Sequence, residues 1–132
     1  MNNNVITFKP LDILNLFSEF ISRNLDGRSG AVLIYIGVVR RYSDKRHKIS
    51  KFILNVNNLD KAESEFKRAV IRIKDFYELN DVCLKCSIGE HNIGEPIVFI
   101  GVSAETRMYL FEAVRELVNM VKQSSYISKH EE

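Results

Sequence analysis

Apolar residues recur at helical spacing in three stretches of the chain, residues 10–25, 58–79 and 104–122, and each stretch is predicted to be a helix. Pro10 suits the first turn of the first helix. Asn57 or Asn58 can cap the second helix, and Ser103 is expected to cap the third. The apolar stripes comprise Ile13, Leu14, Phe17, Phe20 and Ile21; Leu59, Ala62, Phe66, Ala69, Val70, Ile73, Phe76 and Tyr77; and Leu110, Phe111, Val114, Leu117, Val118 and Val121.

Other stretches are continuously apolar or alternate between apolar and polar residues, as strands do. Strands are expected at Ala31–Val39, Ile49–Val56, Val82–Ile88 and Ile97–Val102, with a short one at Val5–Phe8 also consistent with the pattern. The first of these is apolar throughout and mostly β-branched, which favours a strand covered on both faces. The second is interpreted as its return strand in a hairpin, residues 89–95 as a turn, and 123–132 as a polar tail.

This order of helices and paired strands predicts one α+β domain over residues 1–132, with a mixed or antiparallel sheet. The chain has 132 residues, 45% of them hydrophobic and 27% charged, which is ordinary for a globular domain. Its longest apolar runs are far shorter than the about 20 residues that span a membrane, and its polar start does not resemble a signal peptide. We therefore expect a cytoplasmic protein without a membrane partner.

Positive charge is small in total and uneven in distribution. The net charge is +2, too low for the strong basic stripe of a nucleic-acid binder, so no nucleic-acid partner is expected. The basic residues gather at 40–51 and near Lys122 and Lys129. Such a distribution suits a small anionic ligand as well as it suits a solvated loop.

The cysteines and histidines do not form a metal site in the sequence. Cys83 and Cys86 form a single C-x-x-C on a predicted strand, where positions three apart point to opposite faces, and we interpret both as packing residues. One pair supplies too few ligands for structural zinc. His47, His91 and His130 are scattered, and each is interpreted as a surface histidine.

Four cations stand at the ends of predicted elements. Arg40 follows the first long strand, although it could simply flank a hairpin, and Arg107 is expected in the first turn of the last helix. There the helix dipole disfavours a cation, but free backbone N–H groups beside a guanidinium would bind an anion well. Lys122 ends that helix, where a cation is favoured for structural reasons alone, and Lys129 follows in the tail.

Several motifs, in order and spacing, resemble the catalytic (large) subunits of molybdopterin synthase, the MoaE family. The similarity extends from about Pro10 to Glu131. It rests on Gly30-Ala31-Val32 with Ile36-Gly37-Val38-Val39-Arg40; on Ile88-Gly89-Glu90 with Gly94-Glu95; on Val98 to Ala104 continuing into Arg107 and Phe111-Glu112-Ala113; and on Lys122 and Lys129, seven residues apart.

The resemblance implies an α/β-hammerhead-like fold and a homodimer of large subunits. Each would bind a small ubiquitin-like sulfur-carrier subunit with a C-terminal Gly-Gly, giving a heterotetramer. Sulfur would pass from that thiocarboxylated tail to cyclic pyranopterin monophosphate, in two rounds and without metal or cofactor. Lys122 and Lys129 would be catalytic, Lys122 as acid or base. Arg40, Arg107 and Thr106 would bind the anionic substrate, with Thr106 standing where the family has His.

Departures from the family pattern leave other functions open. Cys86-Ser87 replaces a His-Arg pair, Leu54 to Asn57 replaces a tyrosine-containing segment, and Tyr126 and Ser128 replace Pro and Trp. One alternative is a non-catalytic relative that binds a ubiquitin-like subunit without turnover. Another is an unrelated small domain that binds anions or nucleic acid through the basic stretch 40–51.

Overall fold

The computed structural model describes residues 4–132. Within them the helices are α1 (Ile13–Arg23), α2 (Leu59–Phe76) and α3 (Leu110–Gln123). The strands are β1 (Ile6–Thr7), β2 (Ala31–Val38), β3 (Lys51–Val56), β4 (Asp81–Ser87), β5 (Gly89–Asn92), β6 (Pro96–Ala104) and β7 (Ile127–Glu131). No helix among these residues is long and apolar enough to cross a membrane.

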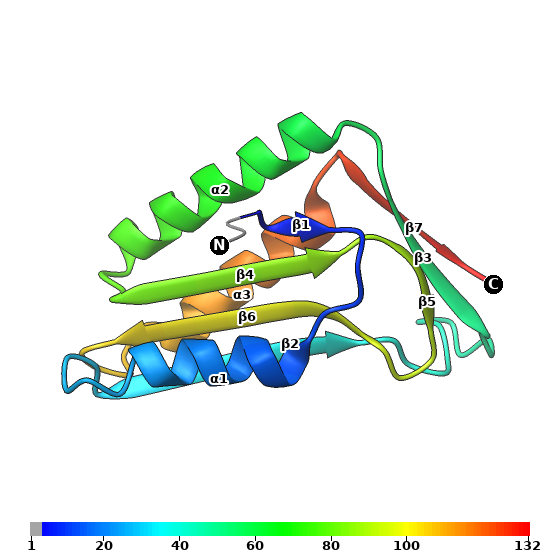
Figure 1. Cartoon of the computed structure of the whole chain (residues 1–132). Coiled ribbons are helices and arrows are strands. Elements are labelled where there is room, and N and C mark those ends of the chain that lie inside the picture. The colour runs from blue at the N-terminus through cyan, green and yellow to red at the C-terminus, as the bar shows by residue number, and fades with distance from the viewer. Residues whose placement is uncertain (1–3) are drawn as a thin grey trace.

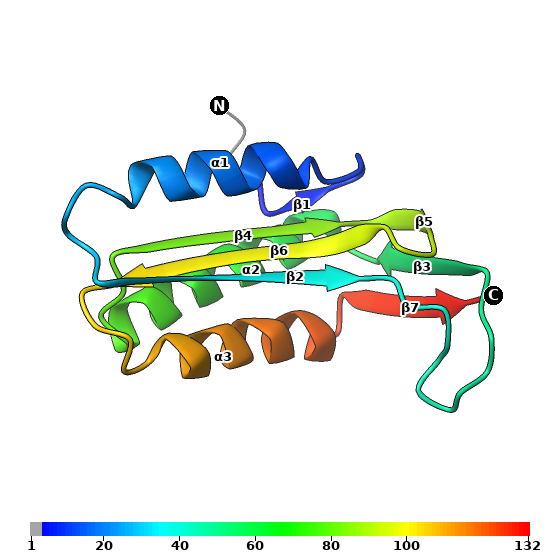
Figure 2. The same ribbon diagram turned by 90° about the horizontal axis from the view of Figure 1, so that it is seen from below.

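A four-stranded mixed sheet forms the centre of the molecule, in the order β1-β4-β6-β2. β1 runs parallel to β4, and the remaining pairs are antiparallel. Helix α1 covers one face, and α2 and α3 cover the other (Figure 2). Strand β6 is buried over most of its length, with Phe99, Ile100 and Val102 fully buried. The core thus lies between this strand and the helices, and the predicted α+β class is confirmed.

A second, antiparallel sheet, in the order β5-β3-β7, stands at one end of the central sheet (Figure 1). The predicted hairpin between the stretches 31–39 and 49–56 is wrong, because β2 pairs with β6 and β3 pairs with β5 and β7. The connection between them folds on itself instead, with Tyr42 bridging to Lys48. Two apolar strands can pair with several partners, and nearness in sequence did not decide between them.

The predicted turn 89–95 and the predicted tail 123–132 each contain a strand, β5 and β7. Both are edge strands of the small sheet, where backbone hydrogen bonds to β3 hold them and most of their residues are exposed. Their polar composition is therefore compatible with strand structure, which the hydrophobic pattern alone does not reveal.

The helix ends agree with the predictions in part. Asn58 caps α2, as one of the two predicted residues, by accepting a hydrogen bond from the Lys61 N–H at 3.1 Å. Ser103, the predicted cap of the last helix, lies instead within β6 and is fully buried. Its hydroxyl donates to the Asn24 side-chain oxygen at 2.6 Å, and α3 begins seven residues later without a side-chain cap. A serine can cap a helix or lie in a strand. Here the hydrogen bond to Asn24, at the end of α1, holds Ser103 within β6.

The burial of several predicted core positions also differs. β2 is the edge strand of the central sheet, and its residues are only partly buried where coverage of both faces was expected, with Ile36 and Val38 exposed. Leu14, Phe17 and Phe111 lie on the solvent side of their helices. A single sheet face can receive only one side of a helix, so the apolar residues at the margin of each stripe remain outside.

Two of the predictions for polar and sulfur residues are decided by burial. Cys86 is fully buried and Cys83 partly buried, both as free thiols, in agreement with a packing role. His91, predicted on the surface, is only 3% exposed. Its Nε2 lies 3.0 Å from the Ser87 hydroxyl, which donates to the Lys9 carbonyl at 3.2 Å. The pairing of β5 with β3 turns this histidine inward opposite Phe52.

Candidate active site

A cavity of about 560 Å³ opens where the central sheet, the small sheet and the end of α3 meet. Its walls are largely apolar, and three of the predicted site residues, Arg40, Lys122 and Lys129, line it. Its other lining residues are Tyr35, Gly37, Val38, Val39, Asp44, Ile49, Phe52, Leu54, Ile97, Val98, Val118, Val121, Ile127 and Glu131. An apolar cavity with a few converging charged groups is the usual form of a small-molecule site.

Arg40 reaches the cavity because β2 changes register at its end. Between Gly37 and Val38 the pairing with β6 shifts by one residue, as in a β-bulge, which turns the strand that follows. Beyond the bulge the chain stays attached, since the Val39 N–H donates to the Glu95 carbonyl at 3.0 Å. Val39 is buried as an anchor, and Arg40 follows it with an exposed guanidinium.

Lys122 and Lys129 meet at the cavity because the chain reverses between them. Lys122 occupies the last turn of α3, as predicted. After it, the Ile127 N–H donates to the Ser124 carbonyl at 3.3 Å and the Tyr126 N–H to the Ser124 hydroxyl at 3.2 Å. This turn leads into β7, which carries Lys129 back along β3. Residues seven apart in sequence therefore line one cavity.

One carboxylate in the cavity joins two of these cations. Asp44 pairs through Oδ1 with the Arg40 guanidinium, and its Oδ2 lies 3.7 Å from the Lys129 ammonium. Lys129 also lies 3.8 Å from a Glu131 oxygen. No described carboxylate forms an ion pair with Lys122. The sequence predictions included neither Asp44 nor Glu131. One signal was available, because Asp44 is the single acidic residue within 40–51.

Arg107 and Thr106, the other predicted substrate-binding residues, lie elsewhere. They belong to the segment 105–109 that follows β6, whereas the β6 residues that line the cavity, Ile97 and Val98, lie at its beginning. Figure 2 shows the two ends of this strand on opposite sides of the molecule. At about 3.4 Å per residue, β6 spans roughly 27 Å from Pro96 to Ala104. The prediction that Arg107 lies in the first turn of the last helix is wrong, because α3 begins at Leu110.

Other regions offer less chemistry. A shallow hollow of about 630 Å³ between α2 and the end of α3 contains none of the predicted residues. Within residues 4–132, no group of three or more His, Cys, Asp or Glu is placed to hold a metal ion. The cavity of Arg40, Lys122 and Lys129 is therefore the candidate active site.

The protein-family comparison matches residues 6–124 to the model of the MoaE protein. The chain belongs to the MoaE family. Membership supports a transferase role in molybdenum cofactor biosynthesis, and it excludes the alternative of an unrelated domain. Among curated proteins, no match to this MoaE family chain was found.

Solved structures agree with the family in fold. A Staphylococcus aureus molybdopterin synthase has a TM-score of 0.83 and 20% identity, covering 100% of this chain and 92% of that one. A Helicobacter pylori complex of subunits 1 and 2 of molybdopterin-converting factor has a TM-score of 0.77 and 18% identity, over 96% of this chain and 82% of that one. The Burkholderia ambifaria MoaE protein has a TM-score of 0.77 and 17% identity, covering 94% of this chain and 78% of that one.

Proposed function

We propose that this MoaE family chain is the catalytic subunit of molybdopterin synthase. It would transfer sulfur from the thiocarboxylated C-terminus of a small ubiquitin-like subunit to cyclic pyranopterin monophosphate. The observation that carries the proposal is the convergence of Arg40, Lys122 and Lys129, from three elements, on one largely apolar cavity. The Helicobacter pylori match, a complex of subunits 1 and 2, supports a small-subunit partner for this chain as well.

The chemistry needs cations because both reactants are anionic. The donor carries a thiocarboxylate and the acceptor a phosphate, so they repel each other unless positive charge lies between them. The flat pterin would lie against the apolar wall, which includes Val98, Val118 and Val121. The guanidinium of Arg40 would hold the phosphate by two-point hydrogen bonding.

Each transfer would form a carbon–sulfur bond to the pterin side chain in place of a carbon–oxygen bond, while the acyl carbon still holds the sulfur. The first transfer would open the cyclic phosphate ester at its carbon, leaving the phosphate attached at its other ester position, and the second would release the neighbouring carbonyl oxygen as water. Water would then break the acyl–sulfur bond, so that the small subunit leaves as a carboxylate and the sulfur stays on the pterin. Lys122 would lie beside the thiocarboxylate and supply or accept the proton in these steps, and Lys129 would stabilise the negative charge. A second donor would complete the dithiolene.

The position of Arg107 and Thr106 makes the homodimer part of the proposal. Leu110 and Lys122 lie at opposite ends of α3, about 18 Å apart at a rise of 1.5 Å per residue, and Arg107 and Thr106 precede Leu110, too far from Lys122 of their own chain to share its cavity. If they bind substrate, they do so in the cavity of a second large subunit. In a two-fold dimer both cavities would then be completed in the same way.

Reconstitution tests the function directly. Purified chain is mixed with a thiocarboxylated small subunit and cyclic pyranopterin monophosphate, and molybdopterin is measured as its fluorescent oxidised derivative. Product above the control without the chain supports the proposal, and Lys122→Ala should abolish that product with unchanged thermal unfolding. Lys74→Ala is the matched control, because Lys74 also lies in the last turn of a helix but outside the cavity. Equal activity of the Lys122 variant and the control would refute the role of Lys122.

Mixing variants tests the shared site. Lys122→Ala and Arg107→Ala, each inactive alone, are unfolded together, refolded and assayed. About a quarter of wild-type activity should return, since half of the dimers are mixed and each mixed dimer keeps one intact cavity. No recovery from two inactive variants would refute the shared site, and an Arg107→Ala protein that is active alone would remove Arg107 from the mechanism. A stable complex with the small subunit but no product from wild type would instead support the non-catalytic alternative.

A further inference from the structure

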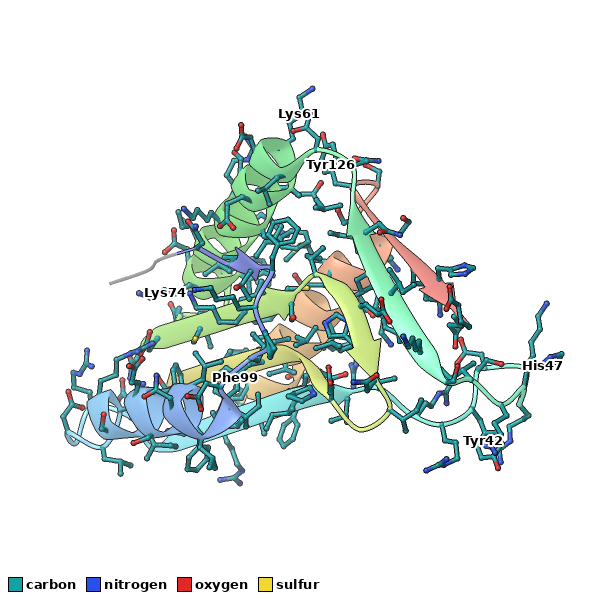
Figure 3. All side chains as sticks on the ribbon, turned by 45° about the vertical axis from the view of Figure 1, so that its right-hand side comes forward. Tyr42, His47, Lys61, Lys74, Phe99 and Tyr126 are labelled. Carbon is teal, nitrogen blue, oxygen red and sulfur yellow. The ribbon has the colours of Figure 1, made fainter. Side chains whose placement is uncertain are left out.

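The loop between β2 and β3 is a small folded arm on the wall of the candidate active site. The Ser43 N–H donates to the His47 carbonyl at 2.8 Å, and the Arg46 N–H donates to the Ser43 carbonyl at 2.9 Å, which closes a turn at its tip. The Arg46 guanidinium lies over the Tyr42 ring, 4.9 Å from its centre. In Figure 3 the arm that carries Tyr42 and His47 projects beyond the small sheet, away from α1.

The tip of this arm places Asp44 against the cations of the cavity. Apart from Asp44, every charged residue from Arg40 to Lys51 is basic or histidine. Yet Asp44 is the residue of the arm that contacts both Arg40 and Lys129, through different carboxylate oxygens. A basic loop that is only solvated does not require a carboxylate that contacts two cations of the cavity at once. A carboxylate held between two cations occupies the position that an incoming anionic group would take.

We propose that Asp44 is a placeholder anion that pairs with Arg40 and Lys129 until the anionic group of the substrate displaces it. The inference rests on the proposed function in taking this cavity as the site of an anionic ligand. The Asp44 side chain is 77% exposed, so water screens its two ion pairs, and they are weak enough to exchange for another anion. Asp44 would also keep the two cations, which come from β2 and β7, from moving apart when no ligand is bound.

Exchange has a consequence for binding. A ligand must displace Asp44 before it can use both cations, so the observed affinity for any anion is lower than the cations alone would provide. After Asp44 leaves, the arm contributes only positive charge near the ligand, including Lys45 and Lys48, which line an adjacent hollow that shares Asp44 and Lys129 with the cavity. Asp44 is thus not a catalytic residue in this proposal but one that sets the affinity of the site.

The test measures binding of inorganic phosphate to the full chain at constant ionic strength, from backbone amide shifts in nuclear magnetic resonance titrations. Asp44→Asn should bind phosphate about three- to tenfold more tightly than wild type, as expected for the loss of two exposed ion pairs. Asp44→Glu restores the carboxylate and should return the affinity close to wild type. Asp26→Asn is the matched control, because Asp26 pairs with Arg28 on the surface outside the cavity.

A double variant identifies the cation that is released. If Asp44 restrains Arg40, the gain in affinity from Asp44→Asn should shrink in the background of Arg40→Gln, and the gain that remains reports the pair with Lys129. Equal or weaker phosphate binding by Asp44→Asn would overturn the inference, and weaker binding would mean that Asp44 builds the site and does not compete for it. Absence of phosphate-induced shifts around the cavity in every variant would also overturn it. Because the readout needs no sulfur donor, failure of the reconstitution assay leaves this result interpretable.

Discussion

The contact between Gly101 and Phe20 provides the most direct test of how α1 is held on the sheet. Phe20 is fully buried, and Gly101 lies beneath it in β6. A Cβ added at Gly101 would lie 2.8, 2.9 and 3.0 Å from three atoms of the Phe20 ring. Normal carbon–carbon contacts lie at about 3.5–4.0 Å, so Gly101→Ala forces the ring to move or the helix to lift.

The magnitude follows from the size of this overlap. Overpacking of a buried site costs about 1–3 kcal/mol of the free energy of unfolding. With an unfolding entropy of about 2.1 cal/mol/K per residue, a chain of this length should lose about 4–10 °C in melting temperature. Urea denaturation and thermal unfolding followed by circular dichroism measure both quantities.

Gly37→Ala is the matched control in the same sheet. There the nearest neighbour of an added Cβ is the Val98 Cβ at 3.5 Å, an ordinary contact. This variant should be neutral or about 0.4–1 kcal/mol more stable, because alanine restricts the unfolded chain. Phe20→Leu should cost less in the Gly101→Ala background than in wild type, since a smaller side chain relieves the overlap. A Gly101→Ala protein as stable as the Gly37→Ala protein would refute the proposed packing of α1.

Two further predictions concern acid stability and thiol reactivity. Partial burial would raise the pKa of Asp81, but hydrogen bonds from Arg23 and Asn24 outweigh it and lower the pKa. The resulting stability is present above the unfolded pKa of about 3.9 and is lost as the pH falls through the lower folded pKa, so Asp81→Asn should reduce the loss of stability between pH 6 and pH 3 in urea denaturation. An unchanged loss would argue against this network. Burial raises the pKa of Cys86 to about 12, so in a Cys83→Ser variant at pH 8 a thiol reagent should label the chain only after denaturant is added, as read by mass spectrometry. Rapid labelling of the folded chain would contradict the burial of Cys86.

Much of the candidate site was accessible from residue patterns. Positions at element ends and family spacing point to Arg40, Lys122 and Lys129, and these three residues line one cavity. The same reasoning points to Arg107, and the family resemblance to Thr106, yet both lie beyond the far end of β6. Motif spacing gives only the order of residues along the chain. The nine-residue strand β6 lies between the cavity and the segment that carries Arg107, so motifs that are close in sequence lie far apart in space.

The amino-acid sequence by itself determined the helices and most strands, because their patterns are local. Spacing of apolar residues and a cap such as Asn58 depend on neighbours within a few positions. The tertiary structure decided which strands pair. Strands pair through backbone hydrogen bonds, and the alternation of apolar and polar side chains along the chain does not show which two backbones meet. In the folded chain β3 therefore lies between β5 and β7, His91 points inward, and Ser103 is part of β6. It also brought Asp44 between two cations, a contact that exists only once β2, β7 and the arm between β2 and β3 have been assembled.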